Sequence, residues 1–409
     1  MEININHKSI DSLKEAGAPV IIVTLPEIAE AISNACKDSG IVVAGFCDNE
    51  TRKLDDLYCG LKVYHTPSLP KYYPEARLLI AYHNLQESAE QLSALGYDEF
   101  YSPLELLNNY DVKKYQHRVS QSFMETRIAV TNKSHESYFD KSKTYLRSLD
   151  VQITTKCSLK CQSCSNLMQY YTSAKNTDTE ILKSIEILAA NVDDISEYRV
   201  IGGEPLMNKD WANIVNGIIE KDIKRKVFIF TNGTIKPKDE QLESFHGKDV
   251  SFYITDYGNL SRNIDNLEKS LKKYNVSYFR KLADNWVDCS GIKKHNRTAQ
   301  ENEIVFNECC AKQLYTLLSG KFFGCPFIAN AVELNAIPDN RFDYVDLHSN
   351  APDLKQKIER VVKMKNFFPA CDFCVGRPKD PTTAKVYNGT GMIAPGIQAS
   401  KPIPYKELI

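Results

Sequence analysis

Three cysteines stand close together in the middle of the chain, Cys157, Cys161 and Cys164, with the spacing C-x3-C-x2-C. Thiolates are ligands for zinc and for iron–sulfur clusters, and both kinds of site normally take four protein ligands. Three thiolates therefore leave one coordination position open for a substrate or a cofactor. The alternative is a structural zinc site that a distant Cys or His completes, and the spacing alone does not exclude it.

A second set of cysteines follows in the C-terminal part of the chain. Four of them form two separated pairs, a pattern that suits either zinc or an iron–sulfur cluster. Their members are Cys310, Cys325, Cys371 and Cys374. Cys309 adjoins Cys310, so spacing does not fully decide which of these two would be a ligand.

The elements that must position the first group come from an alternation of strands and helices. Strands are predicted at 149–155, 197–202, 226–231, 250–255 and 276–280, and helices at 177–191, 209–220, 238–246 and 260–274. Repeats of this length predict an open or closed parallel barrel, which we place at 148–297. Cys157 follows the first of these strands, and barrel active sites are built in the loops at the carboxyl ends of strands.

Two further motifs lie at the ends of later strands. Gly202, Gly203 and Glu204 end the second strand, and Thr231 and Asn232 end the third. A glycine pair lets the backbone approach a ligand closely. Together with the cysteine spacing, the sequence Gly-Gly-Glu-Pro resembles the radical S-adenosylmethionine (SAM) superfamily over about residues 149–290.

This resemblance implies a partial (β/α)6 barrel, a cofactor and a type of chemistry. In that family the three cysteines hold a [4Fe–4S] cluster whose open iron binds SAM, and the Gly-Gly-Glu-Pro motif binds the SAM amino group. Thr231 and Asn232 would lie where family members contact the ribose or carboxylate. SAM is cleaved to a 5′-deoxyadenosyl radical that takes a hydrogen from the substrate, while the protein positions the reactants. Ser163 departs from the family, in which the residue before the third cysteine is usually aromatic and packs by the adenine.

The second cysteine set resembles the opening of the SPASM domain, an appendage of radical SAM enzymes that carries auxiliary clusters. The pattern C-x9-G-x4-C begins at Cys310, which favours Cys310 over Cys309. No cysteine follows Cys374, so the match is to the shortened twitch domain, which holds one auxiliary [4Fe–4S] cluster. Four protein ligands imply electron transfer rather than substrate binding. We place this domain at 298–378, followed by an extended tail at 379–409, and zinc is the alternative occupant.

One more cysteine, Cys289, follows the last predicted barrel strand. Some radical SAM epimerases use a thiol to return a hydrogen atom, and the resemblance makes Cys289 a candidate hydrogen donor. A buried cysteine can also be a small apolar residue without a chemical role. Asp256 and Tyr257 lie on a late loop where substrate contacts could be, but the sequence assigns them no function.

The first 105 residues form another alternation of strands and helices, which predicts a Rossmann-like parallel sheet. The first turn lacks the GxGxxG sequence that dinucleotide binding requires, so a scaffold or docking role is favoured. The region resembles the small Rossmann-like domain that precedes some bacterial sugar acyltransferases. Residues 106–147 are polar and rich in tyrosine, and we expect a connector there.

Composition and charge narrow the remaining functions. The formal net charge is −1, so no overall positive charge favours nucleic acid or an anionic membrane. No run of about 18 apolar residues predicts a membrane span, and the N-terminal segment lacks the apolar core of a signal peptide. Disulfides are therefore not expected among the 12 cysteines in a reducing cytoplasm, and the clustered ones are expected to bind metal or do chemistry. Cys36, Cys47 and Cys59 are scattered singly and are expected to be core or surface residues of the N-terminal domain.

These features predict a radical SAM oxidoreductase or epimerase that acts on a small polar substrate, with a reductant such as flavodoxin or ferredoxin. A sugar or nucleotide sugar is favoured, because twitch-bearing relatives include an aminocyclitol dehydrogenase. The segment CSLKCQSCSN also looks like radical SAM proteins of surface-polysaccharide pathways. One alternative is a peptide-modifying maturase, against which the α/β N-terminal region counts. Another is a non-catalytic iron–sulfur or zinc protein, against which the Gly-Gly-Glu-Pro motif counts.

Overall fold

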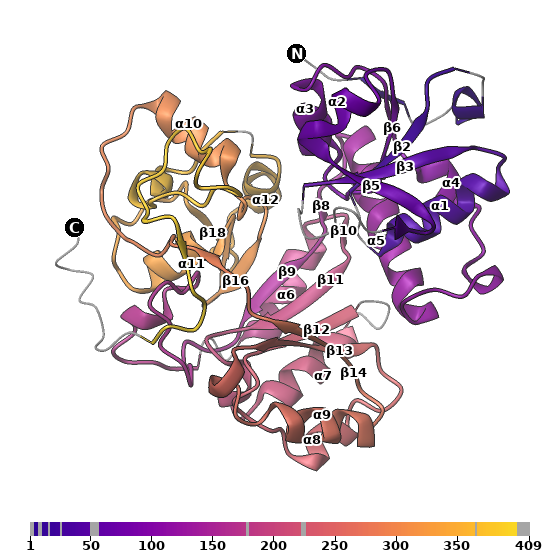
Figure 1. Cartoon of the computed structure of the whole chain (residues 1–409). Coiled ribbons are helices and arrows are strands. Elements are labelled where there is room, and N and C mark those ends of the chain that lie inside the picture. Colours follow the sequence, from indigo (N-terminus) through magenta and orange to yellow (C-terminus); the bar gives the residue numbers. More distant parts are fainter. Residues whose placement is uncertain are drawn as a thin grey trace. The chain divides into compact units, whose positions relative to one another are not determined.

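The computed structural model describes residues 4–6, 10–14, 17–24, 27–49, 57–176, 180–221, 226–364 and 366–398. The chain divides into two compact units, Met1–Lys143 and Thr144–Ile409, and Figure 1 colours them along the sequence. The predicted tail at 379–409 lies partly outside the described residues, because its last described residue is Gln398.

The first unit is built on a seven-stranded sheet in the order β1-β7-β6-β2-β3-β5-β4, in which only the β4–β5 pair is antiparallel. Its elements are β1 (Ile5–Asn6), β2 (Val20–Val23), α1 (Ile28–Asp38), β3 (Val43–Asp48), β4 (Leu57–Tyr58), β5 (Leu61–His65), α2 (Leu69–Tyr72), β6 (Arg77–Ile80), α3 (Leu85–Ser93), β7 (Phe100–Tyr101), α4 (Leu104–Asn108) and α5 (Gln121–Phe139). The central strand β2 is buried along its whole length, as expected of a parallel strand covered on both faces. The predicted Rossmann-like α/β sheet is therefore present.

The segment predicted as a connector is largely part of the first unit. Helix α5 occupies nineteen residues of it and packs against α1, α3 and α4. Met124 and Val130 of α5 are buried, and His135 is fully buried between Ser102 and the carbonyl of Tyr82. The polar composition of this segment reflects the exposed face of a helix, and the boundary between the two units falls at residue 143.

The second unit contains one eight-stranded sheet in the order β14-β13-β12-β11-β9-β16-β17-β18. Its elements are β8 (Tyr145–Leu146), β9 (Leu149–Gln152), α6 (Ile181–Ala190), β10 (Asp194–Ile195), β11 (Glu197–Ile201), α7 (Trp211–Lys221), β12 (Lys226–Thr231), α8 (Asp239–Glu243), β13 (Val250–Asp256), α9 (Ile264–Lys273), β14 (Ser277–Leu282), β15 (Trp286–Val287), α10 (Ala299–Glu308), β16 (Thr316–Leu318), β17 (Lys321–Phe323), α11 (Pro326–Glu333), β18 (Tyr344–Asp346), α12 (Leu354–Val362) and β19 (Met392–Ile393). The five predicted strands correspond to β9, β11, β12, β13 and β14.

Six neighbouring strands of this sheet, from β14 to β16, run parallel, and β17 and β18 continue it as antiparallel strands. This is the predicted partial (β/α)6 barrel. Helices α7 and α9 pack against β12 and β14 (Figure 1). The predicted boundary between barrel and C-terminal domain at residue 297 is not a break in the sheet, because β16 pairs with β9.

The core of the second unit holds the strand ends in place. Trp211 of α7 packs against Phe245 and Phe252, with ring centroids 5.6 and 6.0 Å away. The register places Ile201 of β11 beside Gln152 of β9, so the loops that follow these two strands start side by side. Among the described residues, no helix combines the length and the apolar character needed to cross a membrane.

Candidate active site

The three cysteines of the first group lie in one loop, between β9 and α6. Cys161 is buried, and Cys157 and Cys164 are half-buried. Burial, and then the charge of Cys164, raises the pKa of Cys161 to about 12. Burial also raises the pKa of Cys157, and the charges of Cys164 and Glu204 add to the effect. These thiols therefore stay protonated near neutral pH unless a bound cation displaces the protons, which is the behaviour of a thiolate metal site.

Hydrogen-bond donors lie near the sulfur atoms of this loop. The Leu159 amide donates to Cys157 Sγ over 3.4 Å, and Asn232 Nδ2 lies 3.8 Å from the same atom. Gln398 Nε2 lies 3.8 Å from Cys161 Sγ. The thiols are grouped but not closed around one point: among the described residues, no three His, Cys, Asp or Glu side chains could hold a single metal ion.

The glycine pair after β11 packs directly on the start of the cysteine loop. A Cβ at Gly203 would lie 2.4 Å from Lys156 O, and one at Gly202 would lie 2.7 Å from Thr154 Cγ2. The Gly203 amide donates to Thr154 O over 3.1 Å, and the Glu204 amide donates to Lys156 O over 2.8 Å. Only glycine permits this close approach, which brings Glu204 next to the cysteines.

Glu204 is a fully buried carboxylate. It accepts hydrogen bonds from Thr231 Oγ1 (2.9 Å), the Asn232 amide (2.8 Å) and the Leu206 amide (3.1 Å). Burial raises its pKa to about 7, against the opposing effect of these hydrogen bonds. Within the described chain, Glu204 forms no ion pair with a Lys, Arg or His side chain. A buried carboxylate without a cationic partner fits an ammonium group of a ligand.

Asn232 connects the loops after three strands. Its backbone amide binds Glu204, its Nδ2 donates to Ser158 Oγ over 3.1 Å, and its Oδ1 accepts from the Thr234 amide over 3.1 Å. The structure thus brings together the predicted site residues Gly202, Gly203, Glu204, Thr231 and Asn232 at the edge of the sheet where the three cysteines lie. The side chain of Thr231 is used to hold Glu204.

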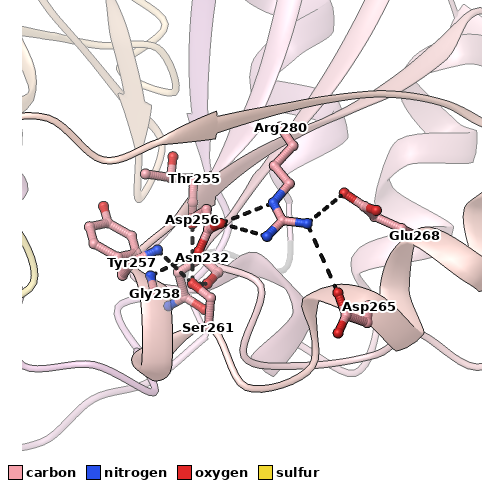
Figure 2. A network of polar contacts seen from close by, with 9 residues as sticks. All are labelled: Asn232, Thr255, Asp256, Tyr257, Gly258, Ser261, Asp265, Glu268 and Arg280. Atoms are coloured by element: carbon pink, nitrogen blue, oxygen red, sulfur yellow. Dashed lines mark hydrogen bonds and ion pairs between the residues drawn. The ribbon is translucent and has the colours of Figure 1, made fainter.

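The loop after β13 is fixed by an ion-pair network (Figure 2). Asp256 Oδ2 accepts hydrogen bonds from Arg280 Nε (3.0 Å) and Nη2 (2.7 Å), and its Oδ1 accepts from the Gly258 amide (2.8 Å). Arg280 also contacts Glu268 over 3.3 Å. Ser261 Oγ donates to Asn232 O (2.7 Å) and accepts from the Tyr257 amide (2.8 Å), so the network is joined to the site.

Tyr257, to which the sequence assigned no function, is a candidate site residue. Burial raises the pKa of its phenol, and the charges of the three cysteines and Glu204 add to this effect. Its ring packs edge-on against Trp286, with centroids 5.7 Å apart, and a Cβ at Gly396 would lie 3.0 Å from it. The only signal in the sequence was its position after a parallel strand.

Ser163, where related sequences have an aromatic residue, has a structural role in this chain. Ser163 Oγ donates to Asp288 Oδ1 over 2.6 Å and accepts from the Cys289 amide over 3.1 Å. Cys289 is buried. The backbone of this predicted hydrogen donor is thus tied to the three-cysteine loop.

Part of the predicted extended tail lies on the cysteine loop. Strand β19 pairs with β15, and beyond it Ile397 O accepts from the Gln162 amide over 2.7 Å. Gln398 Oε1 accepts from the Lys160 amide over 2.5 Å. No pattern in the tail sequence indicated these contacts.

A cavity in the C-terminal part of the unit is lined by four cysteines, Cys309, Cys325, Cys371 and Cys374, together with Phe327, Phe368 and Arg377. Cys309 follows α10, Cys325 precedes α11, and the other two lie in and after the turn Pro369–Phe373. The structure differs here from the expectation for Cys310, which is exposed and does not line this cavity. The backbone at Cys309 is extended, and neighbouring side chains of extended chain point to opposite sides, so only one of the two can face the cavity.

Comparison with known families supports the assignment of the barrel. The model of the radical SAM superfamily matches residues 151–277, which include the cysteine loop, the glycine pair, Glu204 and Asn232. This chain contains a radical SAM domain. The family implies a [4Fe–4S] cluster and SAM. The three grouped thiols fit the cluster, and the Glu204 carboxylate, which has no cationic partner among the described residues, fits the amino group of SAM.

Three curated relatives each match about a quarter to a third of the chain. A GTP 3′,8-cyclase of Lactiplantibacillus plantarum is 35% identical over 109 residues, which are 26% of this chain and 31% of that protein. A probable GTP 3′,8-cyclase of Methanocaldococcus jannaschii is 30% identical over 152 residues, 32% of this chain and 48% of that protein. The molybdenum cofactor biosynthesis protein moc-5 of Caenorhabditis elegans is 30% identical over 109 residues, 25% of this chain and 17% of that protein. The matched parts span less than half of each relative.

Solved structures with a similar arrangement include BtrN in complex with AdoMet and 2-DOIA. It is 15% identical in sequence, covers 56% of this chain and 92% of its own, and has a TM-score of 0.40. The structure of anSMEcpe with bound AdoMet and a Cp18Cys peptide is 13% identical, covers 54% of this chain and 83% of its own, and has a TM-score of 0.37.

Proposed function

We propose that this radical SAM enzyme removes a carbon-bound hydrogen from a small polar substrate. The observation that carries the proposal is the buried Glu204 carboxylate, which has no cationic partner in the described chain and lies beside the three-cysteine loop. Cys157, Cys161 and Cys164 would hold a [4Fe–4S] cluster. When bound, this cluster and SAM together supply a 5′-deoxyadenosyl radical that abstracts hydrogen.

The roles of the protein residues follow from their contacts. Glu204 would hold the SAM ammonium group, with carbonyl groups of the glycine pair close by. Asn232 keeps Glu204 and Ser158 in place through its amide groups. Tyr257 and the tail segment at Gly396 would close the other side and exclude water, which protects a radical from side reactions.

We further propose that Cys309, Cys325, Cys371 and Cys374 bind a second [4Fe–4S] cluster. All four line one cavity, and Cys309 replaces Cys310 in the predicted set. A cluster with four protein ligands supplies electron transfer and offers no open iron to a substrate. Zinc is the alternative occupant, since four thiolates also satisfy a structural zinc site. A single zinc ion would require the thiols to move closer together, because no three such side chains among the described residues could hold one ion.

A second cluster without an open iron favours oxidation over a redox-neutral reaction. Loss of a hydrogen atom from carbon, and then of one electron and the hydroxyl proton, converts a secondary alcohol into a ketone. We therefore favour dehydrogenation of a sugar or nucleotide sugar, in the reducing cytoplasm where thiols stay free. Epimerisation is the alternative if Cys289 returns a hydrogen atom to the same carbon.

The second candidate is a cyclisation of a purine nucleotide. The names of the matched relatives favour it, because they include GTP 3′,8-cyclases. Against it stands the extent of the match, which spans less than half of those proteins. A radical SAM maturase acting on a peptide is the third candidate.

The test is anaerobic turnover of the reconstituted enzyme with dithionite and SAM, using nucleotide sugars, GTP and short peptides as separate arms. Release of 5′-deoxyadenosine that depends on a nucleotide sugar supports the proposal. If 5′-deoxyadenosine is released only with GTP, the nucleotide cyclase is favoured, and if it is released only with a peptide, the maturase is favoured. If no substrate leads to its release, the proposed radical SAM activity is contradicted. In deuterated water, an epimerase product gains carbon-bound deuterium, and a ketone formed by oxidation gains none from the reaction.

A further inference from the structure

Arg377 is a buried arginine that reaches both cysteine groups. It is only 4% exposed. Its Nη2 donates to the carbonyl of Ser165, next to Cys164 in the three-cysteine loop, over 2.5 Å. The same side chain lines the four-cysteine cavity, where its guanidinium lies over the ring of Phe327 at 5.7 Å. One side chain thus touches the loop of the first group and the wall of the second.

The charge of Arg377 is not balanced by a carboxylate. In the part of the chain that the structure describes, Arg377 forms no ion pair with Asp or Glu, and its buried Nε has no hydrogen-bond partner. Burying an unpaired cation costs several kcal/mol. Burial acts to lower the pKa of Arg377, but the charges of Cys289, Cys374 and Cys325 outweigh it and raise this pKa above its usual value.

Two other cations near the cavity are less buried than Arg377. Lys312 also lines the cavity, but its Nζ donates to Asn307 O over 2.6 Å. Arg297 donates through Nη1 to the carbonyls of Cys371 (3.1 Å) and Cys374 (2.8 Å), so it supports the backbone of the turn. None of these three cations forms an ion pair with Asp or Glu in the described residues, but only Arg377 of the three is buried and also touches the three-cysteine loop.

We propose that Arg377 is the shared counter-cation of the two cysteine groups, and that it raises the reduction potential of the cluster bound in each. The proposal rests on the proposed function for the presence of two clusters. An iron–sulfur cluster with thiolate ligands is anionic, and reduction adds one more negative charge. A fixed positive charge in a site of low polarity stabilises the reduced form more than the oxidised form, and so raises the potential.

The experiment compares Arg377→Gln with Arg341→Gln, in which an exposed arginine over Phe342 loses its charge. Each cluster is followed by redox titration with electron paramagnetic resonance, the first in a Cys309→Ala background and the second in a Cys157→Ala background. We expect both midpoint potentials to move to more negative values in Arg377→Gln and to stay unchanged in Arg341→Gln. Arg377→Lys keeps the positive charge, so both midpoint potentials should return most of the way to their wild-type values. Unchanged potentials in Arg377→Gln, or a Lys variant that behaves like Gln, overturn the proposal.

A metal titration separates failure of this proposal from failure of the proposed function. If the wild-type chain takes up no iron, the assignment of clusters is wrong. The counter-cation role is then tested with Co²⁺, whose thiolate absorption bands report binding to the four-cysteine site. We expect about tenfold weaker Co²⁺ binding in Arg377→Gln than in Arg341→Gln, because a tetrathiolate site is also anionic. Equal binding by the two variants contradicts the role.

Discussion

The two cysteine groups of this chain are built in opposite ways. Cys157, Cys161 and Cys164 share one loop after one strand, so their grouping is a property of local sequence. The four cysteines of the cavity come from the end of α10, the start of α11 and the turn Pro369–Phe373, so their grouping depends on how these segments pack. A local group can be identified from spacing, whereas an assembled group is identified with certainty only in three dimensions.

The groups also differ in their surroundings. Around the first group lie a buried carboxylate, amide donors and a tyrosine phenol, which are polar groups suited to a ligand. The cavity of the second group is lined by Phe327, Phe368 and other apolar side chains, apart from its cysteines, Lys312 and Arg377. This contrast suits a first site that binds a cofactor and a second site that only exchanges electrons.

The largest effect is expected from Cys161→Ala, which removes a ligand of the first group. We expect loss of 5′-deoxyadenosine formation by at least about a thousandfold, because an incomplete cluster cannot present SAM. Iron content should fall from about eight to about four per chain. Product analysis and iron determination measure these two changes. Cys36→Ala, at a buried position of the first unit, is the control and should retain both.

The next comparison uses the adjacent pair Cys309 and Cys310. Cys309→Ala should lose the second cluster, so that iron falls from about eight to about four per chain, whereas Cys310→Ala should keep all of it. The reason is that Cys309 faces the cavity and Cys310 is exposed. Iron analysis with absorption spectra measures the outcome. If Cys310→Ala loses iron and Cys309→Ala does not, the ligand set expected from spacing is correct. If neither variant loses iron, the assignment of a second cluster is wrong.

A smaller effect is expected from a change of pH on the affinity for SAM. The pKa of Glu204 is raised to about 7, so the free site is partly protonated at neutral pH. The SAM ammonium group needs the ionised form, and binding should therefore weaken as pH falls below about 7, by up to about tenfold per pH unit, and level off above it. Equilibrium dialysis of the reconstituted protein between about pH 6 and pH 8 measures this. Glu204→Gln should bind SAM weakly at every pH, and a retained pH dependence in that variant would assign the titration to another group.

The smallest effect is expected from Ser163→Ala, which removes the side-chain hydrogen bonds between the cysteine loop and the segment that contains Cys289. It removes hydrogen bonds to Asp288 and from the Cys289 amide, so we expect the free energy of unfolding of the second unit to fall by about 1–2 kcal/mol. Chemical denaturation measures it. Ser165→Ala, at an exposed position of the same loop, should change stability by less than about 0.5 kcal/mol. Equal effects of both substitutions would show that the Ser163 contacts do not stabilise the unit.

Most of the barrel could be predicted from the sequence because its elements follow simple patterns. Strand β12 is a run of β-branched and aromatic residues that is buried on both faces. Helix α9 places Ile264, Leu267 and Leu271 on one face, and all three are buried. The residues of the first site come directly after these strands. Because neighbouring parallel strands end at the same edge of the sheet, the sequence already predicted that these residues lie close together.

The remainder of the site depends on contacts between distant segments. Spacing favoured Cys310, but the side to which each of two adjacent cysteines points is set by the extended backbone after α10. Tyr257 directly follows Asp256, which is held by an ion pair with the distant Arg280 (Figure 2). Its ring packs against Trp286, which is also distant in sequence. Segment 106–143 looked like a connector because α5 exposes much of its surface, although its inner face packs on the first unit.

The contact between Gln398 and Cys161 joins residues that are 237 positions apart along the chain. During synthesis the ribosome therefore releases the three thiols long before the segment that covers them. For that interval the loop lies open to metal carriers and to oxidants alike. Arrival of the tail then closes one wall, so the order of translation itself provides a period for loading the site before it is sealed.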